Sequence, residues 1–282
     1  MSMYPILLII LGVLPAAVII FYILRFDSYN QEPRGLLALL FLSGMIICVP
    51  VYFAEVYLDR IIYDAFGQTG VLYTLIRVLL CVALVEEGFK FLAVRIFGYW
   101  HRDFDEIYDG MIYCVMVGMG FAAVENILYV LGNGVSVAIA RALTAVPVHA
   151  VFGLLMGYYL SLSKFDAAGH TKYAIASLLA PVILHAAYDF LLMVGYLPAL
   201  LLVIVIINLM YKRSFFLIRS VYAIPPIVPF TDPETGITYI PDYPTPDELD
   251  AVPDSQKTIR PPQAPYMPPV TDGTDGGENS QN

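Results

Sequence analysis

Val85-Glu86-Glu87-Gly88-Phe89-Lys90 lies inside an apolar run that extends from about residue 71 to residue 97. Such a run is long enough to cross a bilayer as a helix, which takes about 20 residues. Each charged side chain near the bilayer centre costs roughly 2.5–3.5 kcal/mol on insertion scales. The charges in this stretch must therefore pair with one another, face a protein interior or take part in chemistry.

The composition is that of a polytopic membrane protein. Of the 282 residues, 59% are hydrophobic and 14% are charged, whereas a soluble domain carries about 25% charged residues. The formal net charge of −9 arises almost entirely after residue 220, where ten acidic residues face only Lys257 and Arg260. Residues 1–220 are close to neutral and contain no basic patch that would indicate a nucleic-acid partner.

Seven apolar runs follow one another, and none alternates with the period of two that barrel strands require. The predicted fold class is therefore all-α, a polytopic membrane helix bundle of about seven transmembrane helices. Gly118 and Gly120 are expected to let two of these helices approach closely. The runs cover residues 4–24, 35–56, 71–97, 110–132, 135–162, 173–196 and 198–218.

Basic residues in the connections predict the orientation. They gather after spans 1, 3, 5 and 7, whereas the opposite side offers essentially Arg60, with Arg77 and Arg141 near helix starts. The positive-inside rule then places the N-terminus outside and the tail in the cytoplasm. Residues 221–282 form an acidic tail with thirteen of the twenty prolines, which we expect to be disordered. Its Pro262-Gln-Ala-Pro265 sequence suits a polyproline-binding cytoplasmic partner, although a solvated extension is the simpler interpretation.

Further ionisable side chains lie deep in other apolar runs. Glu86 and Lys90 are four residues apart, as are His185 and Asp189, so each pair shares one helix face. Glu87 lies about 100° around the helix from Glu86 and is free to meet a different partner. The remaining members of this buried polar set are Glu125, the adjacent amide Asn126, and His149.

Each of these residues also has a purely structural interpretation. Glu86 and Lys90 would then form a silent ion pair, His149 would be a satisfied core residue, and His185 would bond to Asp189 within one helix. Such explanations would have to hold in four spans at once. A shared hydrophilic centre is the better interpretation, because intramembrane ionisable residues usually mark functional sites.

Such a centre can activate water. Two neighbouring carboxylates in a low-dielectric site cannot both ionise easily, so one is suited to act as a general acid or base. A histidine nearby can carry a proton or stabilise an oxyanion. Two histidines and a carboxylate can also bind zinc, with His149, His185 and Glu125 as candidate ligands. The sequence has no H-E-x-x-H zinc motif and no G-x-S-x-G serine motif.

Four motifs in this order resemble the PrsW family of bacterial glutamic-type intramembrane endopeptidases. That family is related to the C-a-a-X prenyl-protein proteases and the bacteriocin-processing enzymes. Glu32-Pro33 also fits its pattern, and the resemblance covers roughly residues 20 to 195. The motifs are Glu86-Glu87-Gly88-Phe89-Lys90, Gly120-Phe121-Ala122-Ala123-Val124-Glu125-Asn126, Pro147-Val148-His149-Ala150 and His185-Ala186-Ala187-Tyr188-Asp189.

The resemblance implies a transmembrane protease domain in residues 1–220, with a catalytic core at about 71–196. It implies that Glu86 and Glu87 activate water and that Lys90 pairs with them. Glu125 stands where the prenyl-protease relatives carry a histidine, so ligand, base and orienting roles all stay open for it. The candidate catalytic residues are Glu86, Glu87, Lys90, Glu125, Asn126, His149, His185 and Asp189.

The resemblance also implies a substrate and a location. Family members cut a membrane-anchored anti-sigma factor and so start regulated intramembrane proteolysis in the envelope stress response. We therefore expect a multi-pass protein of the bacterial inner membrane, with zinc as the only candidate cofactor. Two alternatives come from other classes of protein: a proton-coupled transporter, in which the buried ionisable residues form a relay, and a silent scaffold that recruits a partner through its tail.

Overall fold

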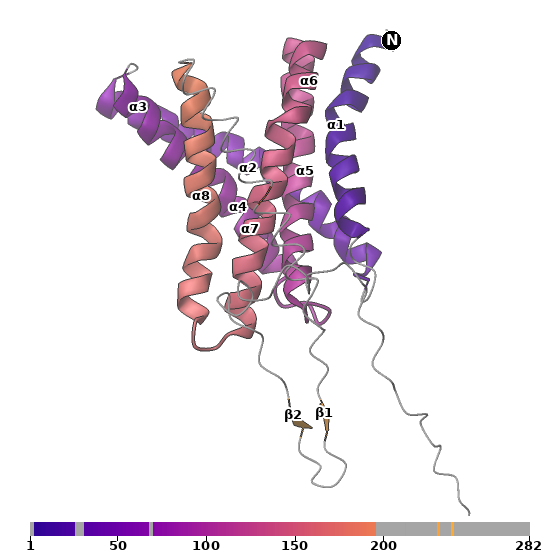
Figure 1. The fold of residues 1–282 in the computed structure, drawn as a ribbon. Helices are drawn as coiled ribbons and strands as arrows, with labels where there is room; N and C mark the ends of the chain where they lie inside the picture. The colour runs from indigo at the N-terminus through magenta and orange to yellow at the C-terminus, as the bar shows by residue number, and fades with distance from the viewer. Residues whose placement is uncertain are drawn as a thin grey trace, which may run out of the picture.

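A computed structural model describes residues 3–25, 31–67 and 70–195, together with Lys212 and the pairs 230–231 and 238–239. Helices dominate this part of the chain (Figure 1). They are α1 (Met3–Leu24), α2 (Arg34–Phe66), α3 (Val71–Ile76), the π-helix η1 (Arg77–Ala83), α4 (Leu84–Phe97), α5 (Ile107–Asn133), α6 (Val135–Leu143), α7 (Ala145–Phe165) and α8 (His170–Val194). The two-residue strands β1 (Phe230–Thr231) and β2 (Thr238–Tyr239) pair antiparallel.

The described helices form a membrane bundle, as the sequence predicts. Five helical stretches are long and apolar enough to cross a membrane, and one of them, Val135–Phe165, includes both α6 and α7. Residues 71–97 are helical throughout, but as three consecutive segments of 6, 7 and 14 residues, none of which is long enough to span alone. Apart from Lys212, the predicted span 198–218 lies outside the described residues, as does nearly all of the tail. The count of seven spans therefore stays a prediction.

Helix α5 forms the centre of the bundle, with α1, α2 and α7 packed around it and α8 packed against α7 (Figure 1). Glycines allow this close packing. A Cβ on Gly120 would overlap the carbonyl oxygen of Phe41 on α2, and a Cβ on Gly157 of α7 would overlap that of Gly110 on α5. The predicted close approach is thus confirmed at Gly120 and also, less tightly, at Gly118, where a Cβ would lie 3.3 Å from the backbone oxygen of His149 on α7.

Two interruptions of regular helix position the buried polar residues. The first is η1, whose seven residues come immediately before α4 and so set the direction from which Glu86 and Glu87 enter the bundle. π-Helical turns are rare and frequently lie at functional sites. The second is the break at Thr144 (φ −124°, ψ −79°), which divides the predicted span 135–162 into α6 and α7. Pro147 lies in the first turn of α7, where no backbone donor is needed.

Candidate functional site

The first element of the site is a bridge from Lys90 to two glutamates on α4. The Lys90 ammonium donates to Glu86 Oε2 at 2.9 Å and to Glu87 Oε1 at 2.8 Å. All three residues are buried, with only 5%, 1% and 3% of Glu86, Glu87 and Lys90 exposed. The predicted pairing of Glu86 with Lys90 on one helix face is confirmed, and the same ammonium also neutralises Glu87.

His149 on α7 joins this bridge to Glu125 on α5. Its Nδ1 lies 3.3 Å from Lys90 Nζ, and its Nε2 lies 3.0 Å from Glu125 Oε2. Because an ammonium can only donate, Nδ1 accepts a hydrogen bond from Lys90. Nε2 must then carry the proton that it donates to Glu125. The hydrogen-bond partners therefore assign His149 to its neutral Nε2–H tautomer.

His185 on α8 lies between two carboxylates. Its Nδ1 is 2.9 Å from Glu87 Oε1, and its Nε2 is 3.3 Å from Asp189 Oδ2. The ring stacks on Phe152, with centroids 4.9 Å apart and planes inclined by 22°. The predicted pair with Asp189 is confirmed, but it is the longer of the two contacts. The imidazole is therefore held firmly on the Glu87 side and more loosely where it faces Asp189.

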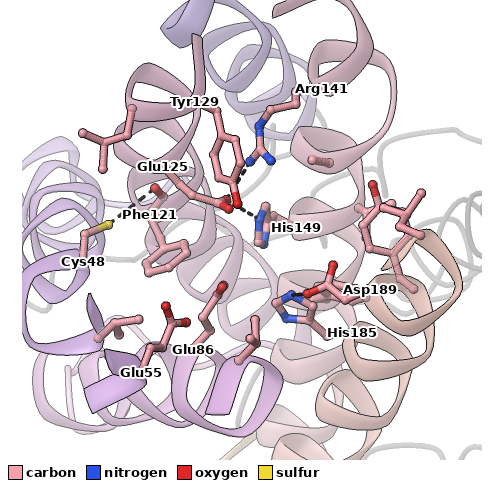
Figure 2. Close-up of a pocket in the computed structure, with 18 of the residues that line it drawn as sticks. Cys48, Glu55, Glu86, Phe121, Glu125, Tyr129, Arg141, His149, His185 and Asp189 are labelled. Carbon is pink, nitrogen blue, oxygen red and sulfur yellow. Dashed lines mark hydrogen bonds and ion pairs between the residues drawn. The ribbon is translucent and has the colours of Figure 1, made fainter. Parts of the chain in front are cut away.

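These side chains border a cavity of about 530 Å³ between α2, η1, α4, α5, α6, α7 and α8. Glu86 lines this cavity, together with Glu125, His149, His185 and Asp189 (Figure 2). Glu87 and Lys90 are not part of the lining, because both lie behind Glu86 in the protein interior. Of the two adjacent glutamates, Glu86 is the one that faces the space in which a ligand and water can enter.

Sequence reasoning missed Arg141. From α6, its Nη2 lies 2.8 Å from Glu125 Oε2 and its Nε donates to Asn126 Oδ1 at 2.9 Å. Asn126, expected among the catalytic residues, is fully buried behind the cavity and also donates to the carbonyl of Gly12 on α1 at 2.8 Å. The sequence does show Arg141 as a charged residue inside the apolar run 135–162. That position indicates a role in the site only once the run is known to break at Thr144.

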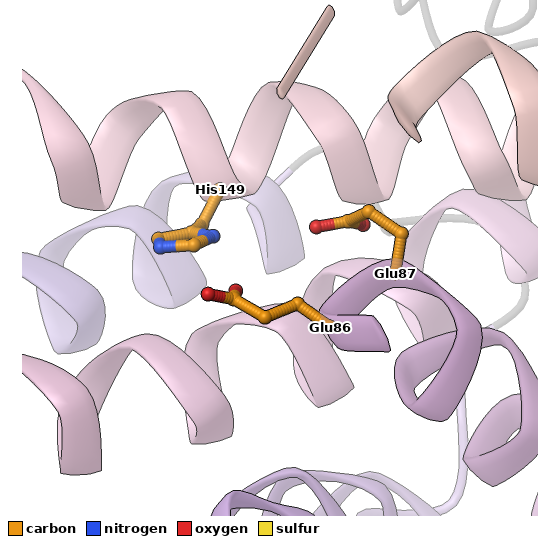
Figure 3. Close-up of side chains that lie close together, drawn as sticks. All are labelled: Glu86, Glu87 and His149. Carbon is orange, nitrogen blue, oxygen red and sulfur yellow. The ribbon is translucent and has the colours of Figure 1, made fainter. Parts of the chain in front are cut away.

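Glu86, Glu87 and His149 form the set best placed for a metal ion, with one ligand atom from each within 4.8 Å of the others (Figure 3). Two carboxylates and an imidazole suit Zn²⁺, so these residues fit a metal by chemical type. The set shares only His149 with the predicted ligands His149, His185 and Glu125. Lys90 Nζ contacts all three residues. A divalent ion would have to take the place of this ammonium, because two cations at that separation repel.

Residues 32–212 match the family model described as "PrsW family intramembrane metalloprotease". The chain is similar to the protein named Protease PrsW from Geobacillus kaustophilus, at 39% identity over 186 residues that cover 66% of this chain and 80% of the relative. It is also similar to that of Bacillus subtilis, at 35% identity over 182 residues (64% and 80%), and to that of Clostridioides difficile, at 33% over 213 residues (73% and 87%). No solved structure gives a significant match.

Proposed function

Because the chain belongs to the PrsW family of intramembrane proteases, we propose that it hydrolyses a peptide bond of a membrane-anchored protein with Glu86 as the general base. The position of Glu86 in the cavity wall carries this proposal. Glu87 has the same chemistry, but only 1% of it is exposed and both of its hydrogen-bond partners, Lys90 and His185, bind the same oxygen, Oε1. Glu87 therefore acts as a positioning residue for Lys90 and His185.

In the proposed reaction, Glu86 takes a proton from a water molecule in the cavity. The water oxygen bonds to the scissile carbonyl carbon, and the carbonyl oxygen becomes an oxyanion. Glu86 then gives the proton to the departing amine nitrogen as the C–N bond breaks. The products are a carboxyl terminus and an amine, and Glu86 returns to its carboxylate form. General acid–base catalysis of this kind contributes typically 10²–10⁴-fold to a rate.

Of the two histidines in the site, His185 is the one suited to stabilise the developing oxyanion. His185 lines the cavity, and its Nε2 makes the 3.3 Å contact with Asp189, which a substrate oxygen can replace. His149 has both nitrogens bonded to Lys90 and Glu125 and acts mainly by keeping these two residues in place. An oxyanion that meets preorganised donors is stabilised without reorganisation of the site.

The depth of the site supports a membrane-embedded reaction. At 1.5 Å per residue, Glu86 lies roughly 17 Å from the end of α4 at Phe97, and Glu125 lies roughly 27 Å from the start of α5 at Ile107. Under the N-terminus-outside orientation, both helix ends are cytoplasmic, and the site extends from near the middle of an about 30 Å hydrocarbon core into its outer half. We propose that the substrate is an anti-sigma factor of the inner membrane, cut within its span.

The family description names a metalloprotease. A bound metal would be held by Glu86, Glu87 and His149, and it would supply a Lewis acid that polarises the scissile carbonyl. The proposed proton transfers use side chains that are already arranged around Lys90. Whether hydrolysis depends on a metal is therefore a different question from whether Glu86 acts as the general base, and each needs its own measurement.

The test of this function is proteolysis by the purified, detergent-solubilised protein of a panel of single-span anti-sigma factors. We expect a defined cut in at least one substrate. Zinc-chelator treatment is expected to spare the rate, with mass spectrometry of the intact protein confirming that no metal is bound. Loss of cleavage together with loss of a bound ion would instead assign Glu86, Glu87 and His149 as ligands. Proton-driven uptake into vesicles without any proteolysis would favour the transporter alternative.

Arg141 gives a second test of this mechanism. Its ion pair positions Glu125, which in turn holds His149, so Arg141→Met is expected to lower turnover by about 10–100-fold, the range for one hydrogen bond to a charged group. The Michaelis constant should change much less, because Glu86 and the other residues that line the cavity remain. Arg141→Lys keeps the charge and should recover part of the rate. Equal activity of the Met and Lys variants would contradict a positioning role.

A further inference from the structure

The charged groups that line the cavity are paired, with one exception. Arg77 pairs with Asp59 at 2.7 Å, and Glu86 with Lys90 at 2.9 Å. Two further carboxylates in the lining have partners as well. Glu125 pairs with Arg141, and Asp189 pairs with His185. Glu55 alone makes no hydrogen bond or ion pair with any residue that the structure describes.

Glu55 belongs to the face of α2 that forms one cavity wall. Cys48, Val51, Tyr52 and Glu55 all line the cavity, and their spacing of three, four and seven residues places them on one side of a helix. Figure 2 shows the Glu55 and Glu86 side chains on the same side of the cavity, next to Phe121. Glu55 is partly buried and lines the cavity, so a group in the cavity can reach it.

An unpaired carboxylate is costly at this place. Burying a charge without a partner is strongly unfavourable, and Glu55 experiences like-charge repulsion from Glu86 and Glu125. Lys90 already has two carboxylate partners and lies outside the lining. No described residue pairs with Glu55, so a basic group that enters the cavity would complete this wall.

We propose that Glu55 is a specificity-determining residue that binds a lysine or arginine side chain of the substrate near the scissile bond. This inference rests on the proposed protease function. A long basic side chain suits the wall, since its aliphatic stem can pack along Val51 and Tyr52 while its charged end reaches Glu55. The resulting pair orients the backbone of the substrate relative to Glu86 without taking part in the proton transfers.

The experiment determines cleavage preferences without a known substrate. Full-length protein in detergent is incubated with a peptide library, made by digesting a bacterial extract with chymotrypsin so that lysine and arginine remain internal. Mass spectrometry of the products gives the residue frequencies around each cut bond. The variants are Glu55→Gln, which removes the charge at nearly constant volume, and Glu55→Lys, which reverses it. Asp64→Asn on the exposed end of α2 is the control, because Arg60, also exposed, is the one partner that Asp64 has among the described residues.

Wild type and Asp64→Asn should both favour lysine or arginine at one position relative to the cut bond. Glu55→Gln should lower that preference by about tenfold, the size of one charge-assisted contact, and Glu55→Lys should replace it with a preference for aspartate or glutamate. Unchanged preferences in both variants, with cleavage intact, would overturn the role of Glu55 and leave the protease function standing. If wild type cut neither the library nor any membrane-anchored protein, the protease function would fall, and this inference with it.

Discussion

Replacing Glu86 with glutamine is expected to lower the rate of peptide-bond hydrolysis by about 10²–10⁴-fold, the usual contribution of a general base. Glutamine has nearly the same volume, and its amide oxygen can still accept a hydrogen bond from Lys90. It cannot take a proton from water. The loss should therefore appear in the single-turnover rate at saturating substrate, while the melting temperature in detergent stays close to that of wild type.

Glu87→Gln is the matched variant for this experiment, because it makes the same chemical change one residue away. Glu87 does not line the cavity, so this variant should retain a higher rate than Glu86→Gln. Its loss should come from weaker positioning of Lys90 and His185. Asp64→Asn, which lies outside the site, should match wild type. A Glu87→Gln variant less active than Glu86→Gln would transfer the role of general base to Glu87.

Lys90→Met should have the largest effect on stability. The change leaves two glutamates buried in the bundle without their shared cation, and breaking a buried ion pair from one side typically costs about 3–5 kcal/mol. The free energy of unfolding, measured by adding sodium dodecyl sulfate to the protein in mixed micelles, should fall by about this amount. The measurement is made with a chelator present, so that no divalent ion can replace the ammonium between the carboxylates and His149.

A double variant distinguishes lost charge balance from lost packing. Adding Glu87→Gln to Lys90→Met removes one of the two uncompensated charges and should recover part of the lost stability. If packing of the lysine stem were the cause, the second change would destabilise further. Wild-type stability of Lys90→Met would contradict the central role of the ammonium altogether.

The local part of this site could be predicted from the sequence. The spacing of four residues correctly pairs Glu86 with Lys90 and His185 with Asp189, because both partners of each pair lie on the same helix. The helical extent of residues 71–97 is also confirmed. The identification of the chain as a helical membrane protein of the PrsW family needed only hydropathy and four short motifs.

The parts that depend on contacts between distant segments could not be predicted. Arg141 meets Glu125 because α6 packs against α5 after the turn at Gly134, and no propensity rule places the break at Thr144 that separates α6 from α7. Glu55 looks like an ordinary acid near the end of the predicted span 35–56, and its isolation is visible only when the partners of all other lining residues are known. Periodicity also does not distinguish the π-helix η1 from an α-helix.

The short sequence separation between Lys90 and its two glutamates has a consequence for the order in which the site is assembled. These three residues leave the ribosome together, so most of their charge is compensated before any other helix is available. His149 follows Lys90 by 59 residues, and His185 follows Glu87 by 98. At synthesis rates of about 5–20 residues per second, these histidines arrive roughly 3–20 s later. The nascent chain can therefore tolerate its paired carboxylates early, yet it has no competent protease site to act on its neighbours until its last catalytic helix is made.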